Sequence, residues 1–294
     1  MSAKARVTAP KPAPRQRRRV MGHVALTLLS AAIALVFALP LMWMLSASLR
    51  QPGLPPPRHF EWVPNPVVWS NYAALFEPGA VVPLARYALN SVLVAALAVP
   101  LTLLTASWAG FAMAQLPARD RRRLALLSVA LLMVPITALW LTRYVLFTWL
   151  GLTDTYGALL APALMGTSPL FVLLFYWAFR RVPNELYESA RLEGARALTI
   201  WRRLALPLAR PTVVAVGVLT FLVYWSDFLS PMLYLRSQSL YTLPLGVQQL
   251  RQLDRSNWPL LMAAAVIMTG PAVLLFLLVQ RYFLGEDGLA EGGG

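Results

Sequence analysis

The side chains that usually carry catalysis or hold metal ions are scarce in this chain. Cysteine is absent, and the two histidines, His23 and His59, lie far apart on segments of opposite polarity, so neither a zinc site nor thiol chemistry is expected. Lys4 and Lys11 are the only lysines, which excludes a phosphate-binding GxxxxGK[ST] loop. We therefore expect this chain to bind no metal and no cofactor, and any work driven by ATP must be done by another protein.

Charged residues between positions 180 and 210 follow a pattern that predicts two short helices, RRVPNELYESARLEGARALTIWRRLALPLAR. The first helix can start at Asn184, and Glu185 and Glu188 then fall in its first turns, where the helix dipole favours anions. Gly194 can end or bend this helix because glycine tolerates positive φ. The expected result is a helix, a glycine bend and a second helix.

The second helix is expected over residues 195–206 and should stop at Pro207. One interpretation of the pair is an interfacial element that lies on lipid headgroups, because the basic residues of the segment suit anionic lipid. Lipid would however repel the three glutamates, and carboxylates on a short projecting helix suit a protein partner better. The pattern favours the protein partner. The glutamates concerned are Glu185, Glu188 and Glu193.

The composition is typical of a membrane protein. Of the 294 residues, 58% are hydrophobic and 13% are charged, whereas a soluble domain averages about 45–50% apolar and about 25% charged residues. Lipid, and not a globular core, must therefore solvate much of the apolar surface. The net charge of +14 on so apolar a chain favours a role in membrane topology, and no nucleic acid is expected as a partner.

Uncharged runs long enough to cross a bilayer core about 30 Å thick occur repeatedly. Helices are the only plausible spanning structure, because the runs lack the alternation of barrel strands. The predicted fold class is an all-α polytopic membrane protein with six transmembrane helices. With six spans, most lysines and arginines lie on the same side of the membrane as the N-terminus. Because basic residues are enriched in cytoplasmic segments, both termini are expected in the cytoplasm. The six spans cover about residues 24–48, 88–116, 124–148, 156–179, 211–235 and 257–280.

The domain organisation follows from these runs. Residues 1–22 form a basic cytoplasmic tail that is expected to be disordered, 23–285 form the transmembrane domain with a cytoplasmic loop at 181–210, and 286–294 form a flexible C-terminal tail. The long proline-rich stretch at 50–86 is expected outside the membrane, and it cannot be a long helix.

Asp227 is a carboxylate inside an otherwise apolar run, and isolated charge in lipid is costly. Trp225 and Ser226 beside it could offer stacking and hydrogen bonds to a solute in a translocation pathway. The alternative is a structural role, in which Asp227 pairs with an arginine or with backbone at a helix break. Arg143 lies near the outer end of the third run, where its long side chain can reach the aqueous interface.

The pattern at 188–207 resembles the EAA loop of ABC importer permeases, EAA-x3-G-x9-I-x-L-P. Both spacings are intact, and the chain departs from the pattern only by mild substitutions at Ser189, Glu193 and Leu204. Further stretches resemble the carbohydrate branch of that family, the maltose-type, MalG-like permeases, in the same order along the chain. These stretches are residues 44–50, 71–72, 90–91, 133–135, 151–155, 225–228 and 242–246.

The resemblance implies a type I ABC importer permease fold and a role as a transporter subunit, not an enzyme. It also implies a bacterial inner-membrane location, a second homologous permease, two ABC ATPases that bind ATP and Mg²⁺, and an extracytoplasmic solute-binding protein. The loop would couple the ATPases to the membrane helices through residues Glu185, Glu188, Ser189, Ala190, Gly194, Leu204 and Pro207. The residues expected to line the pathway are Asn90, Trp225, Ser226 and Asp227.

In the implied roles, Glu188 would contact the ATPase, Ala190 would allow its close approach, Gly194 would set the bend, and Pro207 would end the segment. Sugar or oligosaccharide is the expected cargo. Alternatives that remain open are the same kind of importer with a glycerol phosphodiester or polyamine as cargo, and a stand-alone secondary carrier. A secondary carrier predicts coupling-ion carboxylates near the midplane and paired repeats, and the sequence has one such carboxylate and no obvious repeat.

Overall fold

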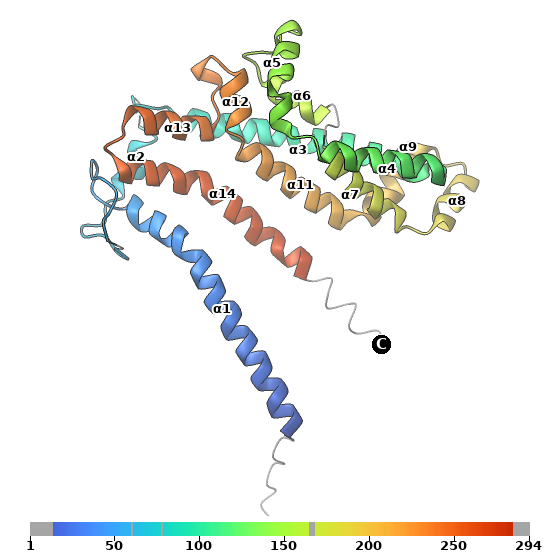
Figure 1. Cartoon of the computed structure of the whole chain (residues 1–294), viewed down its shortest axis with the longest axis horizontal. Coiled ribbons are helices and arrows are strands. Elements are labelled where there is room, and N and C mark those ends of the chain that lie inside the picture. The colour runs from blue at the N-terminus through green and yellow to red at the C-terminus, as the bar shows by residue number, and fades with distance from the viewer. Residues whose placement is uncertain (1–13, 60, 78, 165–167, 285–294) are drawn as a thin grey trace, which may run out of the picture.

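The structure is a computed structural model that describes residues 14–59, 61–77, 79–164 and 168–284. These residues form helices and connecting loops and no strand (Figure 1). The longer helices are α1 (Pro14–Ser48), α3 (Leu84–Gln115), α4 (Ala118–Leu132), α5 (Trp140–Trp149), α7 (Pro169–Arg180), α11 (Arg210–Trp225), α13 (Leu243–Leu253) and α14 (Trp258–Leu284). The shorter ones are α2 (Ser70–Ala74), η1 (Ile136–Leu139), α6 (Tyr156–Leu164), α8 (Asn184–Leu192), α9 (Ala197–Ile200), η2 (Trp201–Ala205), α10 (Leu206–Leu208), α12 (Leu229–Tyr234) and η3 (Gln238–Leu240).

Four helical segments of the described chain are long and apolar enough to cross a membrane, and the number rises to six if each of two sharply bent helix pairs counts as one span. The apolar, multi-span character predicted from the sequence is therefore present, while the count of six spans stays a prediction. The four segments are Ala25–Ser48, Leu84–Gln115, Tyr156–Arg180, of which residues 165–167 lie outside the described residues, and Trp258–Gln280.

The predicted third span at 124–148 is not one straight helix. α4 and the η1–α5 segment meet at an angle of 86°. Pro135 lies at the bend with extended backbone angles. A proline disfavours helical geometry in the residue before it and cannot donate a backbone hydrogen bond, so α4 ends ahead of Pro135.

The predicted fifth span at 211–235 is also interrupted. α11 ends at Trp225, and a separate short helix, α12, begins at Leu229. The backbone N–H of Ser230 donates to Oδ1 of Asp227 at 3.1 Å, so the carboxylate satisfies a donor in the first turn of α12.

The predicted disorder of residues 1–22 is wrong for residues 14–22, which are the first part of α1. Residues 1–13 and the C-terminal tail at 286–294 lie outside the described residues.

α3 runs through the middle of the helix bundle, with α7 and α11 packed along it (Figure 1). Gly110 permits the close approach to α7, because a Cβ atom there would lie 2.7 Å from Cβ of Phe175 and 2.9 Å from the backbone nitrogen of Tyr176. Phe111 and Phe179 fill the same interface with ring centroids 5.8 Å apart. α3 and α7 therefore form a tightly packed pair.

α1 lies mostly outside this bundle. It packs on α14, where the rings of Trp43 and Trp258 are 6.4 Å apart, and it then diverges from the other helices (Figure 1). In the most apolar stretch of Ala25–Ser48, no residue is buried by the rest of the chain. Its apolar side chains are left to lipid or to another subunit.

Candidate functional site: the loop between α7 and α11

The segment between α7 and α11 projects from the end of the bundle that lies opposite α2 and α13 (Figure 1). Its first helix, α8, follows Pro183, whose backbone is extended, and it carries Glu185 in its first turn. This is the start that the sequence predicts to within one residue.

Gly194 ends α8 in a left-handed conformation with φ of +80°. The N–H of Ala195 donates to the carbonyl of Ala190 at 3.0 Å, and the N–H of Gly194 donates to the carbonyl of Arg191 at 2.9 Å. This pair of hydrogen bonds is the Schellman motif, which requires a left-handed conformation at the residue just after the helix, here Gly194. The predicted role of Gly194 as the bend agrees with this geometry.

One face of α8 is fixed to the membrane helices. Tyr187 is buried, its hydroxyl donates to the carbonyl of Phe179 at 3.1 Å, and its ring packs 6.2 Å from that of Phe111. Burial raises the pKa of the Tyr187 phenol, and the nearby Arg180 partly offsets this effect. Movement of α8 must therefore carry α3 and α7 with it, or break these contacts.

The opposite face of α8 is exposed and acidic. Glu185, Glu188 and Ser189 all point to solvent, as a surface for a protein partner requires. Ala190 differs, because it is half-buried against the aromatic cluster of this chain's own α3 and α7. Close approach at Ala190 thus occurs between α8 and the bundle, and not at the outer face of the helix.

Apolar side chains accompany the acidic ones at the tip of the loop. Leu192 is 90% exposed, and Leu186 and Leu198 are also exposed. Several exposed leucines on one short loop are compatible with contact to another protein or to lipid.

The second arm of the loop is one continuous helix, Ala197–Leu208, formed by α9, η2 and α10. Leu204 is half-buried and packs with Ala205 into the aromatic cluster. The prediction that Pro207 ends this arm is wrong by two residues, because the helix turns at Ala209 (φ −98°, ψ 20°) and meets α11 at 85°.

A local widening of the helix explains why Pro207 is tolerated. The turn before it, η2, is π-helical. In a regular α-helix the proline ring would clash with the carbonyl of Arg203, four residues earlier, and the wider π-helical turn relieves such crowding.

The predicted pathway residues lie at the other end of the bundle, and their hydrogen-bonding groups are largely engaged within the chain. Both amide hydrogens of Asn90 have acceptors, the carbonyls of Ser239 at 3.0 Å and Tyr241 at 2.8 Å. Trp225 is buried, and its indole N–H donates to the carbonyl of Met268 at 2.7 Å. These two side chains join helices to each other.

Ser226 and Asp227 lie at the break between α11 and α12. The Ser226 hydroxyl donates to the carbonyl of Leu222 at 2.6 Å, and Asp227 accepts from the first turn of α12 as described above. The structural role that the sequence left open for Asp227, at a helix break, is thus present. A pathway role for Ser226 and Asp227 stays a prediction.

Asp154 is a structural anchor that the sequence reasoning missed. It has a φ of +60°, and its carboxylate accepts hydrogen bonds from the backbone N–H of Arg236, the backbone N–H of Ser237 and the Ser237 hydroxyl. These hydrogen bonds, those of Ser237 most of all, lower the pKa of Asp154. An aspartate in a Gly-Leu-Thr-Asp-Thr turn was the available signal, since Asp is among the few residues that tolerate positive φ.

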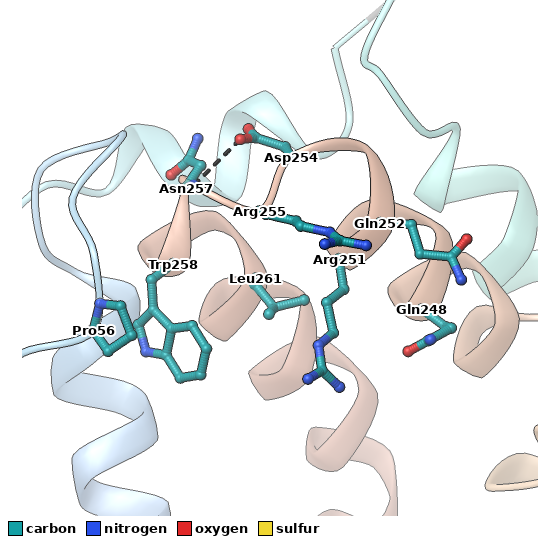
Figure 2. A pocket seen from close by; sticks show the side chains of 9 residues that line it. All are labelled: Pro56, Gln248, Arg251, Gln252, Asp254, Arg255, Asn257, Trp258 and Leu261. Atoms are coloured by element: carbon teal, nitrogen blue, oxygen red, sulfur yellow. Dashed lines mark hydrogen bonds between the residues drawn. The ribbon is translucent and has the colours of Figure 1, made fainter.

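A cavity of about 540 Å³ lies between α13, α14 and the loop that follows α1. Figure 2 shows Arg251 from the end of α13 and Arg255 from the following turn on one side of it, with Leu261 and Trp258 of α14 beside them. The backbone N–H of Asn257 donates to Asp254 at 3.2 Å and shapes the turn. None of the predicted pathway residues lines this cavity.

No group of three or more His, Cys, Asp or Glu side chains with metal-binding geometry occurs among the described residues. The geometry is that of a polytopic helical membrane protein from which a two-sided helix pair projects at one end.

The comparisons with known proteins identify the family. Residues 106–284 match the family of binding-protein-dependent transport system inner membrane components, and the chain belongs to it. The family resemblance inferred from the residues is thereby confirmed.

Several relatives match over most of their length. The chain is 29% identical over 273 residues to the arabinooligosaccharides transport system permease protein AraQ of Bacillus subtilis, which covers 92% of this chain and 95% of the relative. It is 35% identical over 204 residues to AraQ of Halalkalibacterium halodurans, over 69% of this chain and 72% of the relative. It is 26% identical over 283 residues to the trehalose/maltose transport system permease protein MalG of Thermococcus litoralis, over 94% and 98%.

A similar fold occurs in the crystal structure of a bacterial ABC transporter involved in the import of the acidic polysaccharide alginate. The match has a TM-score of 0.72 and covers 94% of this chain and 100% of the other chain, at 20% identity. The chain therefore shares its helical fold with a chain of that transporter.

Proposed function

We propose that this chain is a membrane permease subunit of an ATP-driven ABC importer, and that its cargo is a sugar or oligosaccharide delivered by an extracytoplasmic binding protein. The family supports the role in transport. The names of the relatives, permeases for arabinooligosaccharides and for trehalose and maltose, support the class of cargo.

The observation that carries the proposal is the two-sided construction of α8. Tyr187 and Ala190 fasten it to α3 and α7, while Glu185, Glu188 and the exposed Leu192 are free to contact a partner. An ATPase that binds this outer face and moves would displace α8 as a rigid unit together with α3 and α7. ATP and Mg²⁺ bind to that ATPase in this proposal, and α8 of this chain transmits the movement of the ATPase to the membrane helices.

A second permease subunit completes the proposed importer. α1 diverges from the bundle and buries none of its most apolar window, which suits packing against another helical subunit as well as lipid. We propose two permeases, two ATPases and a binding protein in a bacterial inner membrane, with both termini of this chain in the cytoplasm.

Two alternatives differ in their consequences. An importer for a glycerol phosphodiester or a polyamine would have the same partners and another cargo. A stand-alone secondary carrier would need no ATPase, and the exposed acidic and apolar face of α8 would then have no function.

The test is affinity purification of the tagged chain from its native membranes in mild detergent, with mass spectrometry of the proteins that copurify and an ATPase assay. The proposal expects a P-loop ATPase and a second permease. Replacing Glu185 and Glu188 by arginine should lower ATPase recovery, whereas Glu77→Arg in the outer loop, also exposed, should not. Uptake of radiolabelled oligosaccharides by the complete importer then identifies the cargo. Recovery of the chain alone, with uptake that is independent of ATP, would contradict the proposal.

A further inference from the structure

A second cavity lies on the arm of the loop that returns to the membrane. Its volume is about 480 Å³, and its lining residues all belong to the continuous helix Ala197–Leu208. Arg202 and Arg203 are exposed, and neither lies within ion-pair distance of an acidic side chain in the described part of the protein. The lining residues are Leu198, Thr199, Trp201, Arg202 and Arg203.

The hydrogen-bond donors at this cavity are the guanidinium groups of Arg202 and Arg203. Arginine presents a planar fork of N–H donors, and two such groups together suit a phosphate oxygen. Trp201 is 8% exposed and its indole N–H is buried, so Trp201 contributes its ring to the cavity and not a donor.

The position along α3 places this cavity nearer the membrane than the acidic tip. The ring of Trp201 packs 5.7 Å from that of Trp108, which precedes the end of α3 at Gln115 by about 10 Å of helix rise. α8 contacts α3 further along, at Phe111 and at Gln115, the latter through Arg191. Trp108 is half exposed, and tryptophan is enriched at the membrane–water interface.

We propose that this cavity binds the headgroup of an anionic phospholipid of the cytoplasmic leaflet, with the phosphodiester held by Arg202 and Arg203. The inference rests on the proposed function, because it takes this end of the bundle to face the cytoplasm. Basic residues next to the cytoplasmic leaflet attract its anionic headgroups. The exposed Leu198 lies beside the two arginines and contacts the apolar part of the lipid.

Through this site, the content of anionic lipid in the membrane would affect the conformation of the loop. Trp201, Arg202 and Arg203 belong to the π-helical turn, and Trp201 packs against the aromatic cluster that also holds Tyr187 of α8. A bound headgroup would therefore brace the returning arm, and the depletion of anionic lipid would loosen it.

Lipid binding is tested on the full-length chain by native mass spectrometry in detergent. The chain is titrated with phosphatidylglycerol, with phosphatidylcholine of the same acyl chains, and with inorganic phosphate. We expect one tightly bound phosphatidylglycerol per chain and weaker binding of phosphatidylcholine. Because one basic residue near an anionic surface contributes about 1 kcal/mol, Arg202→Gln and Arg203→Gln should each weaken phosphatidylglycerol binding about fivefold, and the double variant about thirtyfold.

A control variant sharpens the test. The double variant Arg119→Gln with Arg122→Gln removes the same charge from exposed positions on α4 and should bind phosphatidylglycerol as the wild type does.

Three results would overturn the inference. Equal losses in the α4 control would show that diffuse surface charge, and no site, attracts the lipid. Displacement of phosphatidylglycerol by millimolar inorganic phosphate would indicate a site for free phosphate. Loss of ATPase copurification in the Arg202/Arg203 double variant, with unchanged lipid binding, would assign the cavity to the ATPase. The proposed function fails separately, if the wild-type chain recovers no ATPase at all.

Discussion

Gly194 offers the most direct test of how the loop transmits movement. Its φ of +80° lies in the left-handed region, and no atom lies within 4 Å of the position that a Cβ would occupy. A substitution therefore meets no steric clash, and its effect comes from the backbone conformation alone. For an L residue that cost is roughly 1–2 kcal/mol, which corresponds to about a fivefold to thirtyfold loss in the population of the native turn.

The two Schellman hydrogen bonds hold Ala195 and Gly194 against α8, so loss of the turn changes the angle between the acidic helix and the returning arm. We expect Gly194→Ala to lower transport per ATP hydrolysed in the reconstituted importer while the complex still assembles. Gly194→Asn should be milder, because asparagine tolerates the left-handed region, and Gly194→Val should be the most severe. The measurements are uptake and ATPase activity on the same proteoliposomes.

Gly151 provides a matched control. Gly151 follows α5 with φ of +66°, and a Cβ added there would also meet no atom within 4 Å. It sits in the same pair of hydrogen bonds, from Gly151 to Thr148 and from Leu152 to Phe147. Gly151→Ala should carry the same backbone cost without a change in coupling. An unchanged ratio of uptake to hydrolysis in Gly194→Ala, or an equal fall in Gly151→Ala, would refute the reasoning.

Three further predictions concern stability, measured by thermal unfolding in detergent unless stated. Tyr187→Phe should destabilise the protein by about 1 kcal/mol, because it leaves the Phe179 carbonyl without its buried donor. Folding raises the pKa of Tyr187. The stability that this phenol contributes is therefore fully present below the unfolded pKa of about 10 and is lost as pH rises through the folded pKa. If the stability of the wild type changed with pH above 10 no more than that of the phenylalanine variant, the prediction would be contradicted. The lowered pKa of Asp154 predicts the opposite pH dependence. The stability that its carboxylate contributes is present above the unfolded pKa of about 3.9 and is lost as pH falls through the folded pKa. In acid the 236–237 loop should therefore become as sensitive to protease as it is in Asp154→Ala. Gly110→Ala should destabilise the α3–α7 interface by about 1–3 kcal/mol through overpacking, whereas Gly270→Ala in α14, where a Cβ meets nothing within 4 Å, should be neutral or stabilising, and equal effects would count against the packing argument.

Much of the candidate site was predictable because its signals are local. The start of α8, its acidic first turn and the glycine that ends it depend on residues within one or two helical turns of each other. The end of the returning arm was not predictable in the same way. Whether a helix stops at Pro207 depends on the width of the preceding turn, and the aromatic cluster under Trp201 stabilises that turn.

The predicted pathway residues show the reverse situation. Trp225 and Asn90 have the chemistry to bind a sugar, and the structure instead engages them with Met268 and with the loop at 239–241. Their partners lie 43 to 151 residues away in sequence. No local pattern encodes such a pairing.

The sequence by itself determined the class of protein, the apolar runs and the helix–glycine–helix loop, because composition, run length and backbone preference are properties of short segments. Only the tertiary structure decided which face of α8 is buried, where the third and fifth runs break, and which polar side chains are already engaged. Those outcomes depend on which helices meet. Buried polar groups must find partners wherever the fold places them, and contacts across the bundle set that placement.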